Sequence, residues 1–112
     1  MSFTLIELYS PRAAWLSLDA EGRNEVFARI GAGMGGVLAL GVEPIAFGAV
    51  DSAVPHAPDA LFFGAWRAPD RAALDALVAG IATTGWHDYF ETVNAGGETV
   101  DLTAHLGQLA AA

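Results

Sequence analysis

The sequence predicts a single α+β domain whose elements follow the order β-α-β-β-α-β, with a short helical tail. Three observations support this prediction. The chain has 112 residues, which is the size of one domain. Hydrophobic residues make up 54% of the chain and charged residues only 16%, so it can fill a core and is not disordered. Two segments repeat apolar residues at helical spacing, and four short runs are rich in β-branched and aromatic residues.

The first strand is expected over residues 3–9, and Pro11 should end its regular pairing. A helix should then begin after Ser17 or Asp19, because either side chain can cap a helix N-terminus. That helix is expected to run to about Leu40. Its apolar face repeats at intervals of three and four residues and consists of Val26, Phe27, Ile30, Met34, Val37 and Leu38.

The middle of the chain predicts two strands and a second helix. Residues 44–50 and 61–67 are apolar runs separated by a loop of turn-forming residues. The second helix is expected over residues 70–83, after Pro69, with Gly85 as its C-terminal stop.

Residues 87–94 alternate aromatic and polar side chains, which is typical of a strand, and residues 102–109 are expected to form a short C-terminal tail helix. The complete order is that of the split βαβ, or ferredoxin-like, arrangement. It places a four-stranded antiparallel sheet under two helices on one face. We expect this single ferredoxin-like domain to span residues 1–112.

The second face of such a sheet needs a cover. The predicted strands carry more large apolar side chains than a soluble monomer leaves in water: Phe3, Leu5, Tyr9, Ile45, Phe47, Leu61, Phe63, Tyr89 and Val93. We therefore predict a homodimer in which two sheets pack face to face.

Charge and composition exclude several classes of function. The net charge is −8, which repels phosphate groups, so neither nucleic acid nor a membrane surface is an expected partner. The chain has no Cys and no Lys, which excludes thiolate chemistry, disulfides and a lysine Schiff base. The N-terminus lacks the basic region of a signal peptide and no apolar run is long enough to cross a membrane. A cytoplasmic location is expected.

The order of elements resembles the dimeric α+β barrel superfamily. Residues 8–11, 66–73 and 85–94 resemble a family of small bacterial proteins without an assigned activity. The superfamily includes cofactor-independent monooxygenases, haem proteins and lactone isomerases, so the resemblance implies a small-molecule cleft between sheet and helices. Its haem-degrading branch uses an Asn on the first strand and a His in the second helix, and this chain has neither. No cofactor is expected.

Two acidic residues in apolar strands are candidate site residues. Glu7 and Glu91 fall on the first and fourth strands, which are neighbours in this fold. If both faced inward beside Tyr9, burial and like charge would raise one pKa and produce an acid/base pair. Alternatively, each acid is solvated at a strand edge or pairs with Arg12 or Arg67.

The candidate catalytic residues are His87, Tyr89 and Glu91. An imidazole beside Asp88 and Tyr89 can be oriented to act as a base, although a structural role is equally open. No pair of histidines has metal-ligand spacing, so no metal site is expected.

The candidate ligand-binding residues are Glu7, Tyr9, Arg12, Trp15, Trp66 and Arg67. The aromatic members suit a flat apolar ligand and the arginines suit a carboxylate or enolate, but the tryptophans suit a plain core as well. Three functions therefore stay open: binding of a small apolar or aromatic molecule, cofactor-independent oxygenation or isomerisation of an aromatic or polyketide-like substrate, and an assembly module without a ligand.

Overall fold

A computed structural model describes residues 1–112. The predicted order of elements is confirmed, with two additional short helices, α1 and α4. The elements are β1 (Phe3–Pro11), α1 (Ala13–Leu16), α2 (Ala20–Leu38), β2 (Glu43–Ala49), β3 (Phe62–Ala68), α3 (Arg71–Thr83), α4 (Trp86–Tyr89), β4 (Phe90–Glu98) and α5 (Leu102–Ala110).

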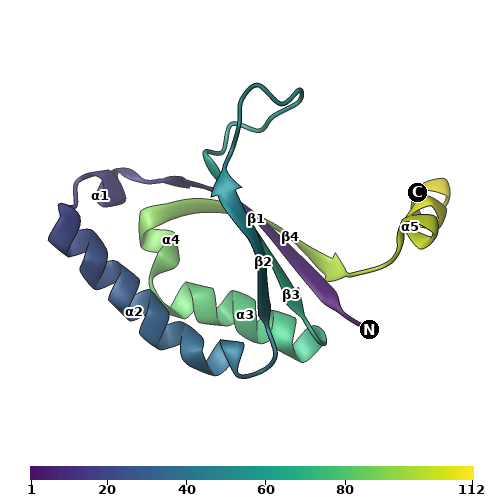
Figure 1. Cartoon of the computed structure of the whole chain (residues 1–112), viewed down its shortest axis with the longest axis horizontal. Coiled ribbons are helices and arrows are strands. Elements are labelled where there is room, and N and C mark those ends of the chain that lie inside the picture. The colour runs from purple at the N-terminus through teal and green to yellow at the C-terminus, as the bar shows by residue number, and fades with distance from the viewer.

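The four strands form one antiparallel sheet in the order β2-β3-β1-β4. Helices α2 and α3 cover one face of this sheet, and α5 lies on the other side, away from the helical layer (Figure 1). The protein therefore has the predicted ferredoxin-like α+β fold. None of its helices combines the length and the hydrophobicity that crossing a membrane requires.

Both long helices begin where the sequence predicts. The Asp19 carboxylate accepts a hydrogen bond from the Gly22 backbone N–H at 2.7 Å, and the Asp70 carboxylate accepts one from Ala73 N–H, also at 2.7 Å. The helices then pack closely, because a Cβ added at Gly80 would lie 2.7 Å from the Val37 side chain. Glycine is what permits this approach of α3 to α2.

The core lies between the sheet and the two long helices. Only 14 of the 112 residues are buried, so the protomer encloses little of its apolar surface. The main cluster consists of Leu5, Met34, Val37, Val42, Ala68, Ala73, Leu74, Leu77 and Ile81. A smaller cluster of Trp15, Val26 and Phe90 lies at the end of the sheet near α1 and α4.

The fourth strand differs from its prediction, because residues 86–89 form the single helical turn α4 and β4 starts only at Phe90. Gly85, with φ = 86°, ends α3 and turns the chain back toward the sheet. Trp86 then stacks on Phe90, with ring centroids 4.1 Å apart. The alternation of aromatic residues reflects this packing as well as the strand. The first strand is longer than predicted and reaches Pro11, which pairs only with β4.

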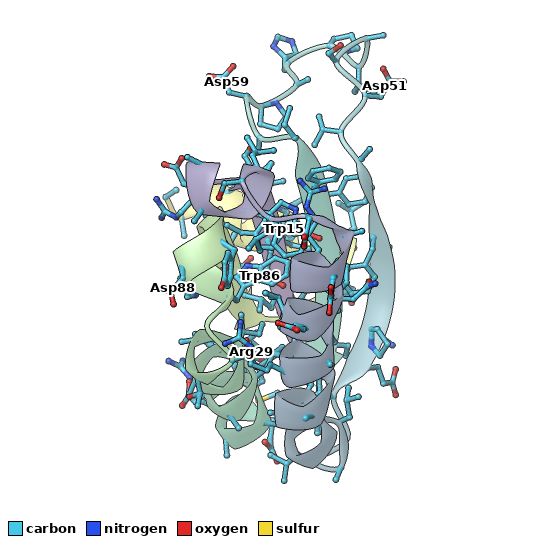
Figure 2. All side chains as sticks on the ribbon, turned by 90° about the vertical axis from the view of Figure 1, so that its left-hand side faces the viewer. Trp15, Arg29, Asp51, Asp59, Trp86 and Asp88 are labelled. Atoms are coloured by element: carbon cyan, nitrogen blue, oxygen red, sulfur yellow. The ribbon has the colours of Figure 1, made fainter.

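Neither long helix covers the second face of the sheet, and we call it the uncovered face. Ile6, Phe63 and Val93 are exposed on it, Val93 to 65%, and Leu8 lies beside Val93 across β1 and β4. The loop between β2 and β3, which carries Asp51 and Asp59, projects beyond the sheet (Figure 2).

Candidate functional site

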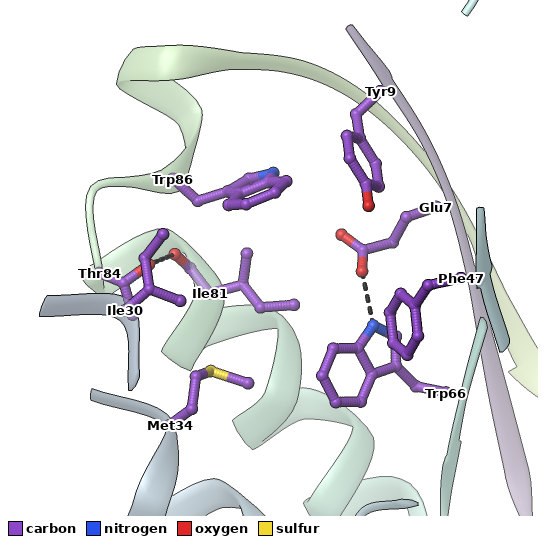
Figure 3. A pocket seen from close by; sticks show the side chains of 9 residues that line it. All are labelled: Glu7, Tyr9, Ile30, Met34, Phe47, Trp66, Ile81, Thr84 and Trp86. Atoms are coloured by element: carbon purple, nitrogen blue, oxygen red, sulfur yellow. Dashed lines mark hydrogen bonds between the residues drawn. The ribbon is translucent and has the colours of Figure 1, made fainter. Parts of the chain in front are cut away.

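A cavity of about 180 Å³ lies between the sheet and helices α2 and α3 (Figure 3). Its walls are almost entirely apolar and are formed by Glu7, Tyr9, Ile30, Met34, Phe47, Trp66, Ile81, Thr84 and Trp86. An apolar cavity of about 150 Å³ is sufficient to bind benzene. This cavity therefore has room for one substituted ring.

Glu7 is the only acidic residue in the cavity wall, and it projects from the middle of β1. Its neighbour across β3 is Gly64, where a Cβ would lie 2.9 Å from the Phe47 ring. The absence of a side chain at Gly64 thus lets Phe47 lie over the sheet. Phe47 in turn packs edge-on against Trp66, with ring centroids 5.1 Å apart, so the aromatic wall beside Glu7 is tightly held.

The Trp66 indole fixes the Glu7 carboxyl group. Trp66 Nε1–H donates a hydrogen bond to Glu7 Oε1 at 2.7 Å. Glu7 is only 4% exposed, and Trp66 is the one side chain that donates to it. The other carboxyl oxygen, Oε2, points into the cavity (Figure 3). One oxygen of a buried carboxyl group is therefore free to meet a ligand.

Burial changes the acid/base properties of the two polar groups on β1. Burial raises the pKa of Glu7 above its ordinary value, and the Trp66 hydrogen bond and, less strongly, the electrostatic influence of His87 offset part of that rise. Burial, and secondly the Glu7 charge, raise the pKa of Tyr9. The Tyr9 hydroxyl therefore keeps its proton at neutral pH. It points toward the Glu7 carboxyl group (Figure 3).

Three of the predicted site residues, Glu7, Tyr9 and Trp66, lie together in the cavity wall. The two predicted arginines lie elsewhere. Arg67 is exposed and forms an ion pair with Glu43 at 3.9 Å. Arg12 is also exposed and donates from Nε to the His87 carbonyl oxygen at 3.1 Å.

Trp15 lies outside the cavity and is buried in the smaller core cluster. Its ring packs against Phe90, with centroids 4.9 Å apart. Figure 2 shows Trp15 and Trp86 near each other in the middle of the view, and only Trp86 lines the cavity. The contacts of Trp15 are those of a core residue.

The three candidate catalytic residues also lie outside the cavity. His87 is exposed on α4, and Tyr89 on the same turn accepts a hydrogen bond from Arg29 Nη2 at 3.4 Å. Glu91 is exposed on β4 and pairs with Ser10, whereas Glu7 pairs with Asn94. Because alternate residues of a strand face opposite sides, Glu7 and Glu91 lie on opposite faces of the sheet. The register rules out an acid/base pair between them.

Sequence reasoning missed several residues of the cavity wall. Trp86 covers one end of the cavity, with its ring edge-on to Tyr9 at 5.0 Å between centroids. Ile30 and Met34 of α2 line its helical side. Their spacing of four residues predicted a buried helix face, but nothing in that spacing distinguishes a filled interior from one with a cavity.

These features define a ferredoxin-like α+β protein that has an apolar cavity with one buried acid on the helical side of its sheet. A family model matches residues 2–112, and the chain belongs to that family, described as a family of unknown function (DUF6616). No curated protein matches the chain.

Several solved structures share the fold. A variant of chlorite dismutase from Candidatus Nitrospira defluvii has a TM-score of 0.62 at 15% identity, over 87% of this chain and 40% of that chain. A dimeric ferredoxin-like protein of unknown function from Thermobifida fusca has a TM-score of 0.53 at 13% identity, over 88% and 92%. SnoaB, a cofactor-independent oxygenase from Streptomyces nogalater, has a TM-score of 0.50 at 12% identity, over 89% and 94%. The chain spans less than half the length of the chlorite dismutase chains.

The cavity does not fit the haem of the superfamily's haem proteins. Haem is a flat macrocycle of four pyrrole rings, and a cavity of about 180 Å³ has room for roughly one ring. No histidine lines the cavity. No group of three or more His, Asp or Glu side chains is close enough together to hold a metal ion.

Proposed function

We propose that this protein binds a small molecule that carries one apolar or aromatic ring and a hydrogen-bond donor, in the cavity at Glu7. The main support for this proposal is the buried carboxyl group of Glu7. One of its oxygens accepts a hydrogen bond from Trp66, and the other is directed into an apolar cavity. A hydrogen bond to a charged group contributes about 1.5–3 kcal/mol. A ligand that donates to Oε2 would gain such a bond inside the cavity.

The size and lining of the cavity narrow the class of ligand. Its volume of about 180 Å³ supports a single substituted ring and gives less support to a multi-ring polyketide. Its polar groups at Glu7 and Thr84 support one anchored end and an otherwise apolar ligand. An assembly module with a filled interior has less support, because this interior contains a cavity.

Phenol and toluene are matched probes for this proposal, since both are one-ring molecules and only phenol has a hydroxyl donor. We expect the intrinsic fluorescence of the protein to report binding, because Trp66 and Trp86 line the cavity. Phenol should bind about tenfold more tightly than toluene, since one hydrogen bond to a charged group contributes about 1.5–3 kcal/mol.

The variant Glu7→Gln should lose this preference for phenol, because its amide presents a donor to the cavity once its oxygen accepts from Trp66. Glu98→Gln makes the same chemical change at an exposed end of β4 and serves as the matched control. Equal binding of the two probes, unaffected by Glu7→Gln, would contradict the proposal.

We also propose that two protomers form a homodimer through the uncovered face of the sheet. This face exposes Ile6, Phe63 and Val93, and the Thermobifida fusca protein with the same fold is described as dimeric. Burial of such a face against a second copy removes apolar surface from water. Sedimentation velocity at several protein concentrations tests it, and a monomer at every concentration would refute it.

A further inference from the structure

We propose that Glu7 and Tyr9 together catalyse the movement of a proton between two carbons of a small unsaturated ketone. In this reaction Glu7 is the base and Tyr9 donates a hydrogen bond to the ketone oxygen. The inference rests on the proposed function, because it requires a one-ring ligand in the same cavity; here an acidic C–H of the ligand meets Glu7 in place of an O–H or N–H donor.

The two groups project from one strand into one cavity. Glu7 and Tyr9 are two residues apart on β1, so both side chains leave the same face of the sheet. The backbone separates such positions by about 6.6 Å, and the hydroxyl of Tyr9 points back toward the carboxyl group (Figure 3). A ketone in the cavity can thus present its oxygen to Tyr9 and its α-carbon to Glu7.

Neighbouring side chains hold both groups in place. Trp66 binds Glu7 Oε1 at 2.7 Å and leaves Oε2 directed into the cavity. The Tyr9 ring packs against Phe62, with centroids 6.0 Å apart, and edge-on against Trp86 at 5.0 Å. A fixed base and a fixed donor lower the barrier of proton transfer, because little reorganisation is needed when the ligand reacts.

The surroundings also suit the two roles. The apolar cavity raises the pKa of Glu7 and so makes its carboxylate a stronger base than a carboxylate in water. It raises the pKa of Tyr9 as well, and the hydroxyl therefore remains protonated and able to donate. A carboxylate base beside a tyrosine donor in an apolar site is an established arrangement for moving protons next to a carbonyl group.

The reaction balances without any added reagent. Glu7 Oε2 removes a proton from the carbon between the carbonyl group and the double bond of a β,γ-unsaturated ketone. The C–H electron pair forms a dienolate whose negative oxygen accepts the Tyr9 hydrogen bond. The carboxylic acid then returns the proton to the γ-carbon, and the double bond moves into conjugation with the carbonyl group. Glu7 ends as a carboxylate, and no oxidant or cofactor is consumed.

The probe for this reaction is β,γ-cyclohexenone, which has one ring and becomes α,β-cyclohexenone, a conjugated product with a stronger ultraviolet absorbance. The wild-type protein should accelerate the conversion above the rate in buffer, and Glu98→Gln should retain that rate. Glu7→Gln should lose about 100-fold or more, which is the usual contribution of a general base. Tyr9→Phe should lose roughly 100-fold, as observed when one donor to an oxyanion is removed.

The pH profile separates a base from a residue that only maintains the cavity. The wild-type rate should rise with pH as Glu7 loses its proton, with a midpoint above the ordinary carboxyl value of 4.5. Glu7→Asp retains a carboxylate one carbon further from the ligand, so it should keep part of the rate and a similar rising limb. This second variant keeps the test informative if circular dichroism shows that Glu7→Gln is unfolded.

Phenol binding provides an independent readout of the cavity. Phenol binding that depends on Glu7, without any Glu7-dependent isomerisation, would overturn the catalytic inference and leave the proposed binding function intact. Failure of phenol to bind would overturn the proposed function and this inference with it. Isomerisation that survives both Glu7 variants would overturn the role of Glu7 as the base.

Discussion

The two faces of the sheet show how one strand serves two purposes. On β1, Leu5, Glu7 and Tyr9 face the helices, and there they complete the core and line the cavity. The residues between them, Ile6 and Leu8, face the uncovered side. The helical face places a carboxyl group in an apolar enclosure. The other face offers an exposed apolar surface that neither long helix covers. This difference is the reason why we propose ligand binding on the first face and self-association on the second.

The largest expected effect is on stability, and it separates two adjacent residues of β1. Leu5 is 2% exposed and lies in the main core cluster, whereas Ile6 is 39% exposed. Leu5→Ala should lower the free energy of unfolding by about 2–5 kcal/mol, because it removes buried methyl groups and leaves a void. In dilute protein, Ile6→Ala should lower it by under about 1 kcal/mol. Urea denaturation measures both, and equal losses would mean that the two faces are equally buried.

The second prediction concerns the uncovered face alone. Val93→Glu introduces a charge at a position that is 65% exposed in the protomer, so the fold should tolerate it. In a face-to-face dimer related by a twofold axis, each copy brings the same charge to the interface. Like-charge contacts of this kind cost several kcal/mol, which corresponds to a loss of dimer affinity of about 100-fold or more.

Sedimentation equilibrium compares Val93→Glu with wild type, and circular dichroism verifies that the variant is folded. Glu98→Gln, which removes a charge near the end of the same strand, is the control and should leave the association constant nearly unchanged. An unaltered dimer in Val93→Glu would show that the protomers associate through another surface.

Most of the fold was predictable because local signals agreed with the global arrangement. Asp19, one of the two predicted caps, caps α2. The second long helix begins within one residue of its predicted start at Asp70, and Gly85 ends it. The turn α4 was not predictable in the same way. Alternating aromatic and polar residues fit a strand, but the stacking of Trp86 on Phe90, four residues later, fits a helical turn followed by a strand. Tertiary packing decides between the two.

The candidate site was less predictable than the fold. An acid in an apolar strand singled out Glu7, and the structure places it in the cavity. The same reasoning singled out Glu91, which lies on the opposite face. A shift of one residue in strand register exchanges the two faces of a strand. The sequence does not define register to that accuracy, so it identified both acids without separating them.

The third prediction concerns the destabilisation caused by burying the Glu7 charge on the helical face of the sheet. Burial raises the pKa of Glu7 above 4.5 in the folded protein. Between pH 4.5 and the raised pKa, Glu7 is more often protonated in the folded state than in the unfolded state. The free energy of unfolding therefore falls as pH rises through this range. Glu7→Gln has no charge to bury. It should therefore be more stable than wild type near pH 7, by on the order of 1 kcal/mol, or roughly 4 °C in Tm.

Thermal unfolding followed by circular dichroism at several pH values checks this prediction. The advantage of Glu7→Gln should shrink as pH falls through the raised pKa and should vanish below 4.5, since wild-type Glu7 is then protonated in both states. Glu98→Gln should show no comparable dependence on pH. A constant difference between Glu7→Gln and wild type at every pH would mean that packing, and not the charge of Glu7, causes it.

The smallest expected effect lies at the end of the chain, on the uncovered side of the sheet. Every residue of α5 is exposed, and its leucines at 102, 106 and 109 form one apolar stripe. Because its own protomer does not pack on that stripe, Leu106→Ala should change the stability of dilute protein by less than about 0.5 kcal/mol. Isolated helices of nine residues are marginal in water, so we expect the leucine stripe of α5 to gain stability from a second copy in the proposed dimer. Thermal unfolding should therefore show that Leu106→Ala is less stable than wild type only at high protein concentration. A loss of 2 kcal/mol or more at both would place α5 on its own protomer and remove it from the surface available to a second copy.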